Sequence, residues 1–123
     1  MELSKAKILA DFVDFSCQAL QISQKPKILI TNNHAWSTTR RSFGEYNASV
    51  PSVTVYINGR NIADVLRTLA HELVHHRQNE LGMINPGSGE TGSDIENQAN
   101  AMAGVLMREY GRMNKIIYES KKR

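Results

Sequence analysis

Residues 61–81 read NIADVLRTLAHELVHHRQNEL, and the rest of the chain can be interpreted outward from this stretch. Its apolar residues recur at steps of three and four, which predicts an amphipathic helix with one buried stripe. Asn61 is suited to cap the start of this helix, and Gly82 to cap its end. The stripe consists of Ile62, Val65, Leu66, Leu69 and Leu73. We therefore expect one side of the helix to pack on a core and the other to border a cleft.

Within this helix, residues 71–75 have the pattern H-E-x-x-H. Residues four apart lie on one helix face, about 40° apart in projection, so His71 and His75 can reach one metal ion at about 2.0–2.1 Å. Glu72 follows His71 directly and can address a water molecule held by that metal. Metal binding lowers the pKa of such a water to about 7, and Glu72 is expected to take its proton during attack on a carbonyl.

The third metal ligand is expected to be a carboxylate. The longer zinc motif with a third histidine is absent, because Gln78 and Leu81 occupy the positions where it has glycine and histidine. Glu96 is the best placed carboxylate, since it follows a turn-rich loop at 85–92 and lies at the edge of the apolar arc of a second helix. Asp94 is the alternative ligand.

Ser93, Asn100 and His76 lie near the expected metal ligands in the sequence, and each has an expected role other than metal binding. Ser93 and Glu96 have the Ser-x-x-Glu spacing of a capping box, so Glu96 has a purely structural alternative. Asn100, one turn after Glu96, can accept the free ring N–H of a metal-bound histidine. His76 lies far around the helix from His75, and we expect it at the surface or beside the ligands.

The remaining sequence predicts a small α+β domain. The expected elements are a helix over 4–22, strands over 27–31, 39–47 and 52–57, a turn at Asn58-Gly59, a helix from Ser93 to Tyr110, and a last helical piece after Gly111. This order indicates a single domain over 1–123 with a small, mixed sheet of about three strands.

Composition limits the classes of protein that fit. The chain has 123 residues and one cysteine, Cys17, which excludes an intramolecular disulfide and a cysteine-rich metal site. It has no apolar run of membrane-spanning length, so a cytoplasmic protein without a membrane segment is expected. The net charge is +3, and the basic residues at 40–41 and 121–123 lack interleaved aromatic residues. A nucleic-acid partner is therefore possible on charge but not favoured.

Two parts of the sequence resemble known zinc peptidases. The stretch 95–107, IENQANAMAGVLM, resembles the glutamate helix of the ImmA/IrrE family of small gluzincin-type peptidases. The upstream half is similar to SprT-like peptidases, with Trp36, then TRRSFGEY at 39–46, VTVYI at 53–57 and LAHELVH at 69–75. These resemblances imply a minimal zincin-like fold, with an active-site helix and a following helix that brings Glu96 as the third zinc ligand.

The interpretation that follows is a zinc-dependent metallopeptidase acting on a protein or peptide. One Zn²⁺ is expected on His71, His75 and Glu96, with Glu72 as general base and then as proton donor to the leaving amine. Two alternatives stay open: a zinc-stabilised regulatory module acting on a DNA-associated partner, and a zinc amidase acting on a cell-wall peptide. The oligomeric state stays open too.

Two further expectations concern the cleft. A donor is needed near the oxyanion that develops in the reaction, and His34, Tyr46 and Tyr56 are the residues considered for it. An extended peptide could add to the strand at 53–57 through main-chain hydrogen bonds.

Overall fold

The computed structural model describes residues 4–84 and 92–119, and these form five helices and one three-stranded sheet. In chain order the elements are α1 (Lys5–Ala19), β1 (Lys27–Thr31), α2 (His34–Arg40), β2 (Gly44–Asn47), β3 (Ser52–Tyr56), α3 (Ile62–Glu80), α4 (Gly92–Met113) and α5 (Ile116–Glu119). The expected α+β class with a small mixed sheet is confirmed.

The strand order in the sheet is β1-β3-β2. β3 pairs in parallel with β1 and antiparallel with β2, so it is the central strand. Parallel strands need a long crossover, which here contains α2 and β2, whereas the antiparallel pair is joined by a short turn. Val53 and Val55 of β3 are fully buried. Within the described residues, β1 and β2 are therefore the edges of the sheet.

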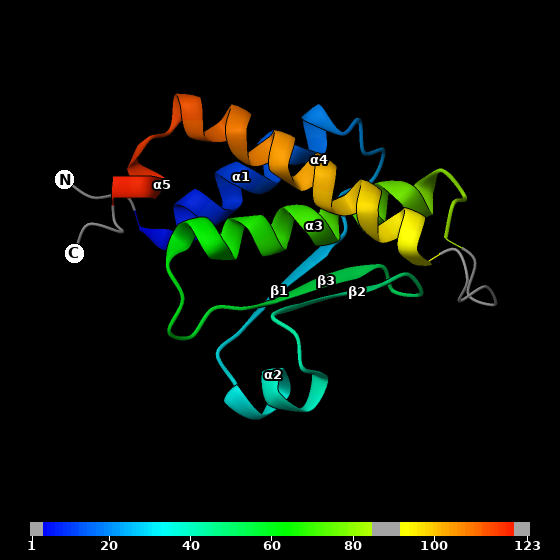
Figure 1. Cartoon of the computed structure of the whole chain (residues 1–123), viewed down its shortest axis with the longest axis horizontal. Coiled ribbons are helices and arrows are strands. Elements are labelled where there is room, and N and C mark those ends of the chain that lie inside the picture. Colours follow the sequence, from blue (N-terminus) through cyan, green and yellow to red (C-terminus); the bar gives the residue numbers. More distant parts are fainter. Residues whose placement is uncertain (1–3, 85–91, 120–123) are drawn as a thin grey trace.

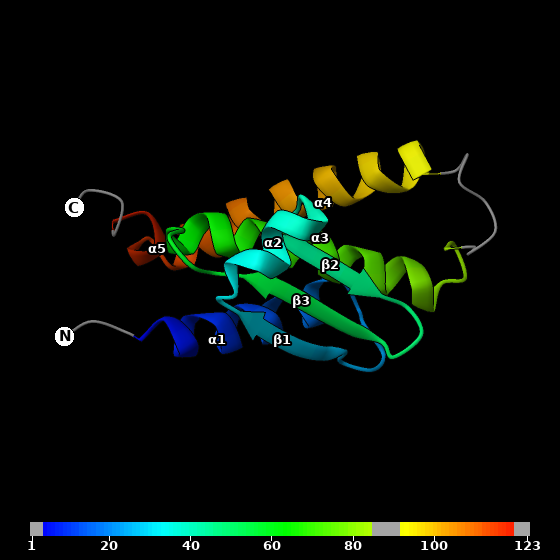
Figure 2. The same ribbon diagram turned by 90° about the horizontal axis from the view of Figure 1, so that it is seen from below.

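The sheet has helices on both faces. α1 and α3 cover one face, and the short helix α2 lies against the opposite one (Figures 1 and 2). α4 packs antiparallel on α3, so the start of α4 lies beside the end of α3 (Figure 1). This arrangement encloses α3 between the sheet, α1 and α4.

The core forms around α3 because most of this helix is enclosed. Leu66, Leu69 and Leu73 of the predicted stripe have no exposed surface and belong to one cluster with residues from the sheet and from the other helices. Burying an aliphatic side chain of this size stabilises a fold by roughly 1.5–3 kcal/mol. α3 is therefore held on several sides, and its polar residues are positioned by a rigid support.

Both predicted caps of α3 are confirmed. The Asn61 side chain accepts a hydrogen bond from the backbone N–H of Asp64, which satisfies a donor that the first turn leaves free. At the other end, Leu81 is the last half-helical residue and Gly82 follows it with a φ of +75°. Glycine adopts this left-handed conformation without strain, so it ends the helix.

The strand expected over 39–47 is wrong in its first half. Residues His34–Arg40 form α2, and only Gly44–Asn47 is a strand. Asn33 caps α2 by accepting hydrogen bonds from the backbone N–H groups of Ala35 and Trp36. α2 is about two turns long, which is too short to show a hydrophobic period, so its cap was the available signal.

The other helix boundaries also shift. α1 ends at Ala19, before residue 22. α4 continues through Gly111 to Met113, so Gly111 does not interrupt it. A Cβ on Gly111 would lie 2.6 Å from the ring of Tyr118, so this glycine allows α5 to pack closely on α4. The expected helical piece with Ile116 and Ile117 is confirmed as α5.

The predicted loop 85–92 lies outside the described residues except for Gly92, where α4 begins. Ser93 is therefore inside the first turn of α4 and not at its N-cap. Among the described residues, every helix is too short or too polar to cross a bilayer.

Candidate metal centre

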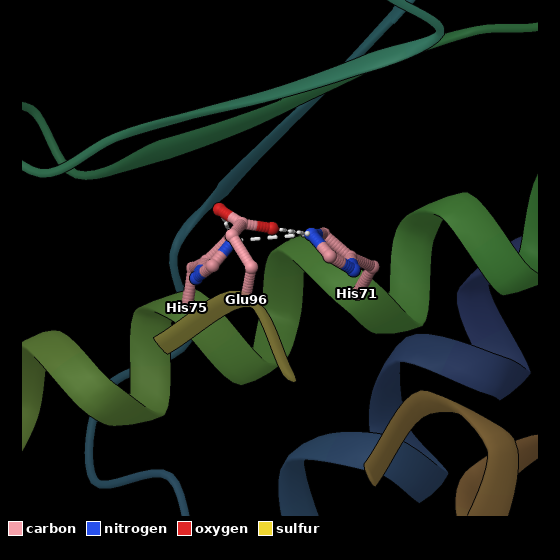
Figure 3. A group of neighbouring side chains, drawn as sticks. All are labelled: His71, His75 and Glu96. Atoms are coloured by element: carbon pink, nitrogen blue, oxygen red, sulfur yellow. Dashed lines mark hydrogen bonds and ion pairs between the residues drawn. The ribbon is translucent and has the colours of Figure 1, made fainter. Parts of the chain in front are cut away.

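The antiparallel packing of α3 and α4 brings the three predicted ligands together. The Glu96 carboxylate reaches from the first turns of α4 to both imidazoles of α3 (Figure 3). Its Oε1 lies 2.9 Å from His71 Nε2, and its Oε2 lies 3.1 Å from His75 Nε2. The two ring nitrogens are 3.1 Å apart. Within the described residues, this is the one group of three His, Cys, Asp or Glu side chains with the spacing of a metal site.

These distances fit a small tetrahedral ion. Ligand atoms that lie about 2.0–2.1 Å from a tetrahedral zinc ion are separated from one another by about 3.3 Å. The three separations here are 2.9, 3.1 and 3.1 Å, so an outward movement of a few tenths of an ångström makes room for the ion. Two imidazole nitrogens and a carboxylate also form a donor set that zinc accepts.

The hydrogen bonding of His75 points to a cation between these side chains. Its Nδ1 donates to Oε1 of Gln78 at 2.8 Å, so in the neutral ring the Nε2 atom has a bare lone pair. That lone pair faces a Glu96 oxygen and the Nε2 of His71. Such electron-rich atoms repel one another at about 3 Å unless a proton or a metal ion lies between them.

Glu72 lies beside the ligands and is almost fully buried, with 8% of its surface exposed. Burial, together with the smaller effect of the nearby carboxylates of Glu96 and Glu45, raises the pKa of Glu72 from 4.5 to about 8. A carboxyl group with a pKa near neutrality can both take and return a proton at physiological pH.

The close approach of strand β2 contributes to this burial. A Cβ on Gly44 would lie 2.5 Å from Thr68 Cγ2 and 3.1 Å from Glu72 Oε2. Any larger residue would have to displace the strand or the side chains of Thr68 and Glu72. The glycine therefore allows the edge strand to lie directly over Glu72.

An open cleft of about 510 Å³ leads to His71 and Glu72. It is bordered by the start of β2 and by faces of α3 and α4. Its lining residues are Ser42, Phe43, Gly44, Arg67, Thr68, His71, Glu72, Asn100 and Ala103. The expectation that both imidazoles face a cleft is thus met for His71, while His75 is not among the lining residues.

The three residues considered as oxyanion donors do not line this cleft. The Tyr46 hydroxyl is bound to His76 Nδ1 at 2.7 Å and accepts from Asn79 at 3.0 Å. His34 and Tyr56 contact each other, with 3.4 Å between Nδ1 and the hydroxyl. Tyr46 faces α3 as Gly44 does, but it meets the helix further along, at His76 and Asn79. His34 lies on α2 and not on a strand, and it holds the Tyr56 hydroxyl away from the cleft.

Two polar residues near the ligands differ from expectation. His76 is neither at the surface nor beside the metal ligands, because it is 2% exposed and contacts Tyr46 and the carbonyl of Gln24. Asn100 lines the cleft, but the ring N–H of His75 binds Gln78 instead. Helical spacing alone predicts which residues share a face, not which neighbour that face meets.

Asp94, the alternative ligand, is exposed and outside the three-residue group.

Comparison with known protein families, with characterised proteins and with solved structures finds no match for this chain. The function of the site is therefore argued from its geometry and from the sequence pattern.

Proposed function

We propose that the protein is a zinc-dependent metallopeptidase. The observation that supports this most is that Glu96 meets both imidazoles of the H-E-x-x-H motif while Glu72 lies buried beside them at the base of a cleft. His71, His75 and Glu96 would hold one zinc ion and leave a fourth position for water. Bound zinc would lower the pKa of that water and polarise the carbonyl of the substrate.

Glu72 is proposed to move the proton. As a carboxylate it would accept a proton from the attacking water, and it would then pass this proton to the nitrogen of the leaving amine. The close approach of Gly44 on β2 buries the Glu72 side chain and restricts where its carboxylate can lie. This restriction favours a short proton path, since a general base has to lie within hydrogen-bond reach of its water.

The edge strand β2 is the proposed site for the backbone of an extended peptide. The sequence assigned this role to the strand at 53–57, which is wrong because β3 is paired on both sides. Tyr56 N–H donates to the carbonyl of Phe43 at 2.8 Å. In an antiparallel ladder the backbone groups alternate, so those of Tyr46 point away from β3 toward the free edge, whereas those of Gly44 are bound by the Ser42 hydroxyl. Gly44 also lines the cleft.

Arg67 is the proposed donor to the developing oxyanion or to an acidic group of the substrate. It lies on the same face as His71, one turn earlier, and its exposed guanidinium borders the cleft. The hydroxyls that line the cleft are already committed, since Ser42 donates to the Gly44 carbonyl and Thr68 to the Asp64 carbonyl. A cationic donor of this kind can stabilise charge that forms in the transition state.

The test is hydrolysis of an unfolded protein such as casein by the metal-free chain with and without one equivalent of Zn²⁺. We expect cleavage that depends on zinc, stops with a chelator and falls at least about a hundredfold in Glu72→Gln, which keeps its zinc. Wild-type cleavage by Glu72→Gln would contradict the proposal. Zinc binding without any hydrolysis would favour the regulatory module, and cleavage of peptidoglycan fragments alone would favour the amidase.

A further inference from the structure

Gln78 is a buried polar residue one turn after His75 on α3. Only 1% of its surface is exposed, although its amide has two donors and an acceptor that need partners. A buried amide left without partners would cost about 1–3 kcal/mol for each unmade hydrogen bond. The contacts of Gln78 therefore show what the fold requires of it.

All three contacts of this amide involve the metal centre or the helix that carries Glu96. Its Oε1 accepts from His75 Nδ1 at 2.8 Å. Its Nε2 donates to the backbone carbonyl of Ile95 at 3.1 Å and to Gln98 Oε1 at 2.7 Å. Ile95 directly precedes Glu96 in α4.

The orientation of the amide follows from these partners. The Ile95 carbonyl can only accept, so the Gln78 atom that faces it has to be the nitrogen. The oxygen then faces His75, whose Nδ1 has to carry the proton. This leaves the His75 Nε2 lone pair directed at Glu96 and His71, which is the state that a metal ligand needs.

The amide also supplies a directional contact where α4, close to Glu96, meets α3 through small side chains. The residues that α4 buries next include Ala99 and Ala103, which are 0% and 2% exposed. Small side chains let two helices approach closely but offer little resistance to sliding along the helix axis. A hydrogen bond to one particular carbonyl has a narrow range of distance and angle, so it selects one register.

We propose that Gln78 is a positioning residue that couples the two halves of the metal centre. One side chain sets the tautomer of His75 and holds α4 one residue before Glu96, so that ligands from two helices converge. The expected effect on zinc binding rests on the proposed zinc site. The hydrogen bonds by which Gln78 connects His75 to α4 are present in the metal-free protein.

The first test is zinc affinity, measured by competition with a chromophoric chelator, together with the visible spectrum of the Co²⁺-substituted protein. Gln78→Met keeps the length of the side chain and removes its hydrogen bonds. We expect a ten- to hundredfold loss of zinc affinity and a changed Co²⁺ spectrum. Wild-type affinity and an unchanged spectrum would overturn the proposal.

Tyr46→Phe is the matched control. The Tyr46 hydroxyl bonds to His76 of α3, the helix that also carries Gln78, and it touches none of the three proposed ligands. The substitution should lower stability while zinc affinity and the Co²⁺ spectrum stay as in the wild type. An equal loss of affinity in Tyr46→Phe would show that the Gln78 effect is general destabilisation, and would overturn the assigned role.

A second variant, Gln78→Glu, separates the two contacts. It can still accept from His75 Nδ1, but it places an oxygen against the oxygens of Ile95 and Gln98. We expect zinc affinity to fall at least tenfold here too, because α4 loses its fixed register. Wild-type affinity in Gln78→Glu would refute the coupling to α4.

A measurement without metal separates this inference from the proposed function. In the NMR spectrum of the metal-free protein, the His75 Nδ1 proton should exchange slowly in the wild type and in Gln78→Glu, and its signal should vanish in Gln78→Met. If the wild type binds no zinc but shows this pattern, the metallopeptidase proposal fails and the positioning of His75 stands. A signal unchanged in Gln78→Met would refute the positioning.

Discussion

His75 and His76 are adjacent in the sequence and both buried, yet they lie in two regions of opposite character. At His76 every polar atom has a partner of the right kind: Nδ1 accepts from the Tyr46 hydroxyl, and Nε2 donates to the Gln24 carbonyl. At His75 one nitrogen is satisfied by Gln78, and the other faces a second imidazole and a carboxylate. Burial does not distinguish a structural histidine from a ligand, whereas the chemistry of its partners does.

The region around His76 connects the end of α3 to the rest of the fold. Glu80 accepts hydrogen bonds from the backbone N–H groups of Ser23 and Gln24, both at 2.9 Å. Burial alone would raise the pKa of the Glu80 carboxyl, but the two backbone hydrogen bonds, together with the nearby basic side chains of His76 and Arg77, hold this pKa below its usual value. Tyr46 adds a connection to β2. This region therefore supports the α3 helix on which two of the proposed ligands lie.

The largest expected difference between the regions is in zinc binding. His75→Ala removes a ligand and should abolish stoichiometric zinc binding, a loss greater than the ten- to hundredfold typical of removing an outer partner. His76→Ala should keep zinc but lose about 2–4 kcal/mol of unfolding free energy, because it leaves a cavity and unpaired polar groups. Zinc titration and urea unfolding of both variants test this contrast, which fails if His76→Ala loses zinc while folded.

The next effect concerns the stability of the metal-free protein as a function of pH. Because the folded-state pKa of Glu72 is about 8 and its ordinary value is 4.5, the folded chain retains a proton that the unfolded chain releases. The contribution of Glu72 to stability is therefore full below about pH 4.5 and is lost as the pH rises to 8. Glu72→Gln removes this loss because its amide does not ionise. The free energy of unfolding of the variant should exceed that of the wild type by up to about 5 kcal/mol at pH 8.

Urea unfolding of both chelated proteins at pH 5, 6.5 and 8 measures this difference. The gap in unfolding free energy should widen with pH. A constant gap, or one that narrows with rising pH, would show that Glu72 is not held in a desolvated environment. His76→Ala provides the comparison, since it should not alter the Glu72 titration.

A smaller effect is expected at Gly44, where β2 meets the metal region. Gly44→Ala places a methyl group 2.5 Å from Thr68 Cγ2 and 3.1 Å from Glu72 Oε2. The strand or these two side chains have to shift, which should cost about 1–3 kcal/mol of unfolding free energy. Peptide hydrolysis should fall while zinc affinity changes little. Full activity in Gly44→Ala would argue against the role of β2 at the cleft.

The smallest effect is expected two residues further along the same strand. Tyr46→Phe removes the hydroxyl that connects β2 to His76 and Asn79 and should cost about 1–2 kcal/mol. Because Tyr46 does not line the cleft, the rate of hydrolysis at a temperature well below melting should be unchanged. A hundredfold loss of activity with intact zinc binding would restore Tyr46 as a donor in the reaction.

The same contrast explains what could be predicted from the sequence. The helix over 61–81, its caps and the convergence of Glu96 on His71 and His75 follow from local periodicity and from the restricted choice of ligands. The partners of His76 and Gln78 come from α4, β2 and the segment near Gln24, so they depend on tertiary packing that no local pattern contains. Gln78 had one signal, a polar residue at helical spacing from a ligand histidine.

The strands show the same limit. The composition of residues 52–57 predicted a strand, but which strand is central depends on the crossover that places β1 beside β3. The peptide-binding role was therefore assigned to a strand whose two edges are occupied. The helix α2 was missed because about two turns are too few to establish a period.

The most direct test of the account is a crystal structure of the zinc-loaded protein with anomalous data collected on both sides of the zinc absorption edge. We expect one zinc peak, bonded at about 2.0–2.2 Å to Nε2 of His71, Nε2 of His75 and a carboxylate oxygen of Glu96, with Glu72 outside the bonding distance. A zinc ion bound elsewhere, or one coordinated by Asp94 in place of Glu96, would contradict it.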